Sequence, residues 1–184
     1  MKQNKIYYIH GYLSSPQSRK GELLKEKLNV IPIKYRDCEP ENLEISDCLK
    51  NIYDKIRNDK EVILIGSSFC GYLSVRVSKT SQNIKKLILL NPSIIPPDVD
   101  INTIKNMPIR ILKEMKEINL FNSKLEITIY IILGSEDIFV PNCWSIEFAK
   151  AQEAKILFLN DDHSFSKNLN NMPKIINQII NQKN

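Results

Sequence analysis

The feature that most constrains the fold is an alternation of short apolar runs with longer amphipathic segments. Residues 61–66, 85–91 and 126–134 are almost continuously apolar, which is typical of strands buried on both faces of a sheet. Further strands are expected at 5–11, 30–35 and 154–160. Strands that alternate with helices predict a single α/β domain over residues 1–184, with about six mostly parallel strands and helices on both faces.

Helical spacing of apolar residues fills the intervals between these runs. In the first interval, Ser15 is the expected N-cap and Pro16 fits the first turn, where its missing N–H costs nothing. Pro32 cannot donate to a strand ladder, so its strand is expected at an edge of the sheet. The helices are expected at 14–29, 41–58, 69–80, 142–152 and 170–182.

Composition argues against several classes of partner. The formal net charge of +5 comes from scattered lysines and arginines, so no nucleic-acid surface is expected. The four cysteines include no C-x-x-C pair and there are only two histidines, so a zinc site is not expected. The nucleophilic chemistry inferred below needs no metal or organic cofactor either. No apolar stretch reaches the roughly 20 residues that span a bilayer, and no secretory signal opens the chain. A cytoplasmic protein with free thiols is predicted, and its oligomeric state is left open.

Polar residues follow three of the apolar runs, and ligands bind at this edge of parallel sheets. Ser67 and Ser68 end the first run, Glu136 and Asp137 follow a later one, and His163 follows the last. A serine hydroxyl is a weak nucleophile, so an imidazole must take its proton and a carboxylate must orient the imidazole. The order serine, acid, histidine therefore predicts nucleophilic catalysis at the strand ends.

The motif G-x-S-x-G decides between the two serines, because it places the nucleophile third. Gly66–Ser67–Ser68–Phe69–Cys70 therefore names Ser68. Gly66 gives the turn room, Ser67 is a small residue without catalytic duty, and the N–H of Phe69 is expected to face the developing oxyanion. Cys70 departs from the motif, but its side chain is small enough for the turn to form.

Several segments then carry a resemblance to a known family. They are "HGYLSSPQS" at 10–18, "GSSFCGY" at 66–72, the segment around Asp137, and "HSF" at 163–165. The chain resembles the α/β-hydrolases, and more narrowly the small YqiA-type esterases, whose size leaves room for only a minimal cap. The resemblance implies the α/β-hydrolase fold and the hydrolysis of short acyl esters or acyl-CoA thioesters.

The resemblance also assigns residue roles. It implies Ser68 as nucleophile, Asp137 as orienting acid and His163 as base, with oxyanion N–H groups on Tyr12 and Phe69.

Glu136, Asp161 and Asp162 are the rival acids. Asp137 is preferred because residues 138–141 close a strand-end loop after it, whereas Asp161 and Asp162 lie too close to His163 in sequence to reach behind its ring.

Other polar residues receive structural interpretations. The ring of His10 is expected to hydrogen-bond neighbouring loops, and Cys143 is expected to pack in the core beside Trp144. Arg19 and Lys20 start a helix near the site and could contact a phosphate of coenzyme A, but an exposed helix face is the expectation.

A short cap insertion is expected at 94–122, where the pattern is irregular. Its apolar residues could wall an acyl pocket: Ile94, Ile95, Ile104, Met107, Ile111, Leu112 or Met115.

Together these features predict a serine hydrolase whose partner is a small-molecule acyl ester or thioester. Two alternatives remain open. One is a non-catalytic binding protein on the α/β-hydrolase scaffold, and the other is an acyltransferase that uses the same triad.

Overall fold

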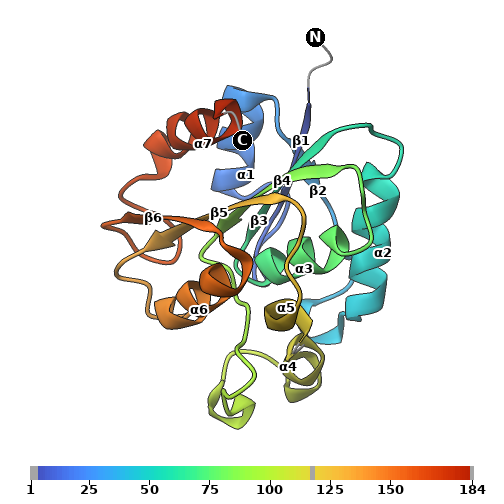
Figure 1. The fold of residues 1–184 in the computed structure, drawn as a ribbon, viewed down its shortest axis with the longest axis vertical. Helices are drawn as coiled ribbons and strands as arrows, with labels where there is room; N and C mark the ends of the chain where they lie inside the picture. The colour runs from blue at the N-terminus through green and yellow to red at the C-terminus, as the bar shows by residue number, and fades with distance from the viewer. Residues whose placement is uncertain (1–3, 117–118, 183–184) are drawn as a thin grey trace.

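The computed structural model describes residues 4–116 and 119–182. Its strands form one six-stranded sheet in the order β2-β1-β3-β4-β5-β6, and every neighbouring pair is parallel (Figure 1). The prediction of about six mostly parallel strands is confirmed. The strands are β1 Lys5–Ile9, β2 Ile31–Ile33, β3 Val62–Ser67, β4 Ile84–Leu90, β5 Thr128–Gly134 and β6 Lys155–Leu159.

Helices cover both faces of this sheet (Figure 1). Side chains alternate between faces along each strand, so Tyr8 belongs to the hydrophobic cluster that includes α1 and α7, while Tyr7 and Ile9 belong to the cluster that includes α2, α3 and α6. The helices are α1 Arg19–Leu28, α2 Ile45–Ile56, α3 Phe69–Ser78, α4 Ile109–Met115, α5 Asn119–Asn122, α6 Asn142–Gln152 and α7 Met172–Asn181. Among the described residues, no helix combines the length and apolar character needed to cross a bilayer.

The first helix begins later than the sequence predicts. Ser18, not Ser15, is the N-cap, and its hydroxyl accepts a hydrogen bond from the Gly21 N–H at 3.2 Å. The chain first makes two turns, closed by the Ser14 N–H on the Gly11 carbonyl and the Ser18 N–H on the Ser15 carbonyl. These turns occupy the residues that the spacing assigned to the first helical turn.

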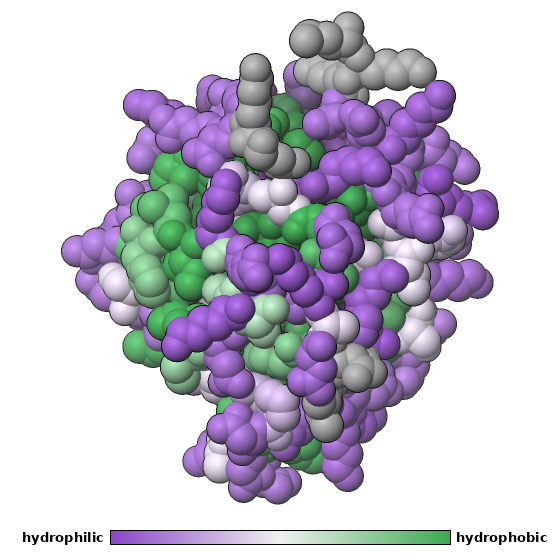
Figure 2. All heavy atoms as spheres, in the orientation of Figure 1, coloured by the Kyte–Doolittle hydropathy of each residue, from purple (hydrophilic) through white to green (hydrophobic). Residues whose placement is uncertain are grey.

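Both edge strands of the sheet are partly exposed. β2 lies at one edge, as Pro32 predicts. β6 lies at the other, where Leu157 and Phe158 are 40% and 49% exposed. Figure 2 shows hydrophobic residues gathered over this edge, at the left of the view.

The segment between β4 and β5 carries the short 3-10 helix η2 Ile101–Thr103, then α4 and α5. In Figure 1, η2 and α4 project beyond the sheet at the bottom of the view. Residues 117 and 118 of the insertion expected at 94–122 lie outside the described residues.

A buried lysine anchors the closing helix to the sheet. Lys86, on β4, donates hydrogen bonds to the carbonyl oxygens of Ile179, Ile180 and Gln182 at 2.8, 3.3 and 3.0 Å. These carbonyls end α7, where the negative pole of the helix favours a cation.

Candidate active site

Ser68 occupies a strained turn between β3 and α3. Its φ of 54° and ψ of −124° lie in a region that non-glycine residues rarely adopt. The surroundings hold this conformation: the Ser68 N–H donates to the Leu90 carbonyl at 2.9 Å, while the Ser68 carbonyl accepts from the N–H groups of Gly71 and Ser93 at 2.8 and 3.0 Å. Such a turn projects the serine hydroxyl above the strand ends.

Two glycines make the turn possible. A Cβ on Gly66 would clash with the backbone carbonyl of Cys70, and a Cβ on Gly71 would lie 2.5 Å from the Pro92 Cβ. Glycine is therefore needed at 66 and 71, while position 70 tolerates a side chain. The thiol of Cys70 is buried, and burial raises its pKa well above the ordinary value, which disfavours a reactive thiolate.

Asp137 and His163 are joined by a hydrogen bond between Oδ2 and Nδ1 at 2.7 Å. The Asp137 side chain is only 1% exposed, so water does not compete for this bond. Its Oδ1 accepts from the N–H groups of Phe139 and Val140 at 2.8 and 3.1 Å, which fixes the carboxylate. With Nδ1 as the donor to Asp137, Nε2 of the neutral ring is left as a proton acceptor.

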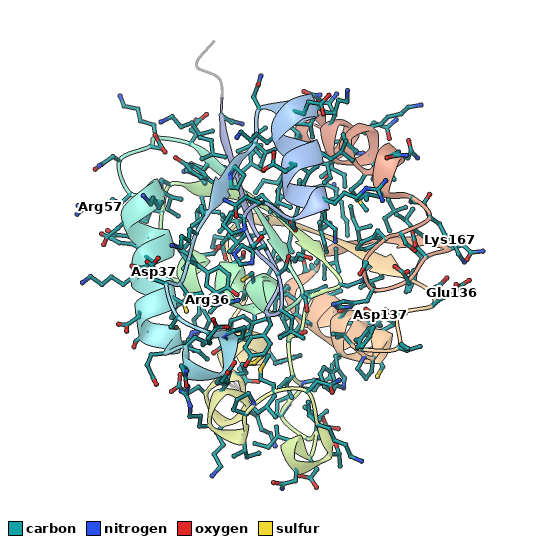
Figure 3. All side chains as sticks on the ribbon, turned by 180° about the vertical axis from the view of Figure 1, so that it is seen from behind. Arg36, Asp37, Arg57, Glu136, Asp137 and Lys167 are labelled. Atoms are coloured by element: carbon teal, nitrogen blue, oxygen red, sulfur yellow. The ribbon has the colours of Figure 1, made fainter. Side chains whose placement is uncertain are left out.

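The rival acids have other partners. Glu136 pairs with Lys167 at 2.7 Å, and Figure 3 shows both at the periphery beside Asp137. Asp161 is buried and accepts from the N–H groups of Asp162, Lys167 and Asn168, as well as from the Asn168 side chain. Burial would raise the pKa of Asp161, but these donors hold it below its ordinary value.

Asp162 also folds the loop that carries His163. Its carboxylate accepts from the N–H groups of Ser164 and Ser166 and from the Ser166 hydroxyl. The Ser166 hydrogen bond is the main cause of its lowered pKa. Asp161 and Asp162 therefore shape the backbone around His163, and within the described residues neither carboxylate is hydrogen-bonded to its ring.

Asn91 ties the same loop to the sheet, and sequence reasoning missed it. It follows β4 with a φ of 44°, and its Nδ2 donates to the carbonyls of Asp162 and His163 at 3.3 and 3.0 Å. Its Oδ1 accepts from the Gly134 N–H at 2.8 Å. A polar residue directly after a continuous apolar run is the signal that could have identified it.

One cavity of about 960 Å³ brings Ser68 and His163 together with Tyr12. The Ser68 Oγ lies 3.4 Å from the Ser93 Oγ, and within the described part of the chain it makes no hydrogen bond to His163. Ser93 is a second polar neighbour that sequence reasoning missed; its partner is 25 residues away in the chain.

The expected apolar wall is largely present. Ile94 and Ile111 pack in the core and not on the cavity. The other expected residues line the cavity: Ile95, Ile104, Met107, Leu112 and Met115.

Tyr12 and Phe69, the residues assigned to the oxyanion site, contact each other through their rings, whose centres lie 5.7 Å apart. Phe69 is the first residue of α3, and the first N–H groups of a helix have no intrahelical partner. The turn before Tyr12 approaches the nucleophile, since a Cβ on Gly11 would lie 3.4 Å from the Ser68 Cβ.

The structure agrees with the interpretation of His10 but not with that of Cys143. His10 donates to the Gly11 carbonyl at 3.0 Å, and burial lowers its pKa to about 4, so it is neutral and structural. Cys143 is exposed, because α6 directs Ser145, Phe148 and Ala149 inward instead. The expectation that Cys143 packs in the core is therefore wrong.

The expectation of an exposed face is also wrong for Lys20. Its side chain is partly buried and lines the cavity.

Among residues 4–116 and 119–182, no group of three or more His, Cys, Asp or Glu side chains is placed to hold a metal ion.

The sheet, the strained serine turn and the acid–histidine loops have the arrangement of the α/β-hydrolase fold. Solved structures share this fold at low sequence identity. Est1E from Butyrivibrio proteoclasticus, with ferulic acid bound, has a TM-score of 0.79 and 19% identity over 97% of this chain and 88% of its own. Mouse alpha/beta hydrolase domain-containing protein 10 has a TM-score of 0.77 and 18% identity over 97% and 90%.

Esterase Pf2001 from Pyrococcus furiosus is also similar, with a TM-score of 0.70 and 17% identity over 96% of this chain and 80% of its own. Among curated proteins, none matches the chain by sequence. The family model described as "Uncharacterised protein family (UPF0227)" matches residues 5–180, so the chain belongs to this family.

Proposed function

We propose that the chain is a serine hydrolase that cleaves carboxylic esters or acyl thioesters through Ser68, His163 and Asp137. The observation that carries the proposal is the hydrogen bond between the buried Asp137 carboxylate and His163, whose imidazole lines the same cavity as the strained Ser68. The esterase and hydrolase names of the structural neighbours agree with this chemistry.

In the proposed reaction, the Ser68 Oγ attacks the substrate carbonyl carbon while Nε2 of His163 takes the hydroxyl proton. Asp137 keeps the ring in the tautomer that can accept this proton and stabilises the imidazolium. The N–H groups of Tyr12 and Phe69 stabilise the tetrahedral oxyanion. Collapse of this intermediate breaks the bond to the alcohol or thiol, which leaves with the proton from His163.

Water completes the cycle. His163 takes a proton from a water molecule as it attacks the acyl-enzyme, and the proton then returns to Ser68 as the acid leaves. The Ser68 hydroxyl must first turn from Ser93 towards His163. Such a change is ordinary, because catalytic hydrogen bonds often align only when substrate is bound.

The assignment is tested with p-nitrophenyl acetate and butyrate. Ser68→Ala is expected to lower kcat by a factor on the order of 10³–10⁶, as loss of a triad nucleophile does. Ser15→Ala is the matched control, because Ser15 is exposed and lies outside the cavity. Equal rates for wild type and Ser68→Ala would refute the proposal.

A fluorophosphonate probe separates the alternatives. Covalent labelling of Ser68, located by mass spectrometry and absent in Ser68→Ala, is expected for an active hydrolase. An unlabelled wild type would favour a non-catalytic binding protein. Product analysis in the presence of added alcohols or amines distinguishes hydrolysis from acyl transfer.

A further inference from the structure

The proposed mechanism leaves the ammonium group of Lys20 unused. Lys20 belongs to the first turn of α1, and its side chain lines the same cavity as Ser68 and His163. Its Nζ lies 3.5 Å from the Ser67 Oγ and 4.9 Å from the ring centre of Phe165. A positive charge therefore lies beside the residue that precedes the nucleophile.

A comparison with Lys86 shows that Lys20 has unused hydrogen-bonding capacity. An ammonium group has three donors. Lys86 uses them on three carbonyl oxygens at 2.8–3.3 Å and serves the fold. Among the residues that the structure describes, Lys20 has one hydroxyl acceptor, at the limit of hydrogen-bonding distance. Donors of Lys20 thus remain for a group that enters the cavity.

The charge of Lys20 also lacks a close counter-ion. Burial lowers its pKa to about 8, while Asp162, Asp161 and Asp137 oppose this shift, so Lys20 is a cation at neutral pH. Within the described residues, no carboxylate lies at ion-pair distance from its Nζ, and these three acids already accept hydrogen bonds from His163 or from loop N–H groups. An incoming anion would supply the missing partner.

We propose that Lys20 binds a carboxylate of the substrate, so that the preferred substrates are half-esters or half-thioesters of short dicarboxylic acids. The inference rests on the proposed hydrolase function. Because Lys20 lines the same cavity as Ser68 and its Nζ lies 3.5 Å from the Oγ of the adjacent Ser67, an anion bound at Lys20 would lie near the carbonyl under attack. The phosphates of coenzyme A do not fit this position, since the pantetheine arm separates them from the thioester.

Acyl pairs of equal length test this specificity. Monoethyl succinate, glutarate and adipate are compared with ethyl butyrate, pentanoate and hexanoate by measuring ethanol release. The wild type is expected to favour the charged member of at least one pair by about 10- to 100-fold in kcat/KM, the usual range for a hydrogen bond to a charged group. Lys20→Met is expected to abolish this ratio, whereas Lys20→Arg retains part of it.

Lys25→Met is the matched control, because Lys25 is an exposed lysine on the same helix and lies outside the cavity. Its charged-to-neutral ratio is expected to equal that of the wild type. The inference is overturned if the wild type hydrolyses the neutral esters but shows no preference for the charged ones. It is equally overturned if Lys20→Met lowers both members of every pair by the same factor.

A binding measurement separates this inference from the proposed hydrolysis. Calorimetry with monoethyl glutarate uses Ser68→Ala and the double variant Ser68→Ala/Lys20→Met. Binding that needs Lys20 supports the carboxylate site even if the wild type hydrolyses no ester, in which case only the proposed function fails. Equal binding by both variants overturns the carboxylate site even if the wild type is an active esterase.

Discussion

The turn that carries Ser68 and the loop that carries His163 are held in place by different means. The serine turn follows β3 inside the sheet, with β1 and β4 on either side, and close backbone packing at Gly66 and Gly71 fixes its shape. The histidine loop follows the edge strand β6, where side-chain oxygens of Asp161 and Asp162 collect the loop N–H groups. Close packing alone can fix the conformation of a turn that has strands on both sides. A loop at the edge of the sheet has a neighbouring strand on one side only, so polar side chains must accept its backbone hydrogen bonds.

Among the tests of this contrast, substitution of Gly66 is expected to have the largest effect. The added Cβ of Gly66→Ala would clash with the Cys70 carbonyl, and a backbone atom cannot move aside cheaply. We expect a loss of about 1–3 kcal/mol in the free energy of unfolding, typical of overpacking. Activity should fall by about 10²-fold, because a small displacement of the nucleophile is costly. Thermal melts and p-nitrophenyl butyrate kinetics provide the measurements.

If Gly66→Ala keeps the melting temperature and activity of the wild type, the serine turn is not set by steric packing.

The donor amide of Asn91 is expected to matter less, and mainly for kcat. Asn91→Asp keeps the acceptor for the Gly134 N–H but removes the donors to the carbonyls of Asp162 and His163. Loss of these bonds should misplace the imidazole and lower kcat about 10-fold, with little change in KM. Asn83→Asp is the matched control.

Asn83 lies just before β4, as Asn91 lies just after it, and its amide also donates to two carbonyls, those of Ile56 and Asp59. Asn83→Asp should lower stability without a comparable loss of kcat. If both variants reduce kcat equally, Asn91 acts only through overall stability.

The last test concerns the acid dependence of the histidine loop and is measured in stability alone. The pKa values of Asp161 and Asp162 are lowered in the folded chain, so their contribution to stability is present above the unfolded pKa of about 3.9 and is lost as pH falls through the folded values. Urea unfolding at pH 6 and pH 3 measures this loss.

Asp161→Asn should be less stable at pH 6 by about 1–3 kcal/mol and should change less between the two pH values. Asp98→Asn, at an exposed aspartate, serves as the control and should follow the wild type. An Asp161→Asn variant with the pH dependence of the wild type would mean that this carboxylate does not hold the loop.

The same contrast explains what sequence could predict. The sheet and the serine turn were predictable because continuous apolar runs define buried strands and the glycine spacing is imposed by local sterics. The helix at 142–152 has the predicted bounds. The helix expected at 14–29 begins only at Arg19, because the two turns before it depend on hydrogen bonds that spacing does not encode.

The contacts of Asn91, Ser93 and Lys20 could not be predicted in this way. Each contact joins segments far apart in the chain, such as Asn91 with His163 and Lys20 with Ser67. Likewise, the roles of Glu136 and Asp137 depend on which of the two carboxylates the loop turns inward. The two residues are adjacent in the sequence, so tertiary packing and not sequence position decides this orientation.

The anchoring of α7 by Lys86 has a consequence for the far end of the chain. The carbonyls of Ile179, Ile180 and Gln182 solvate the ammonium group of a lysine on β4, a charge that burial alone would disfavour. Shortening the chain to residue 178 would leave that cation without these acceptors. The last turn of α7 therefore supplies the hydrogen-bond acceptors for a charge on an interior strand. Loss of this turn would destabilise β4 at the centre of the sheet as well as the helix itself.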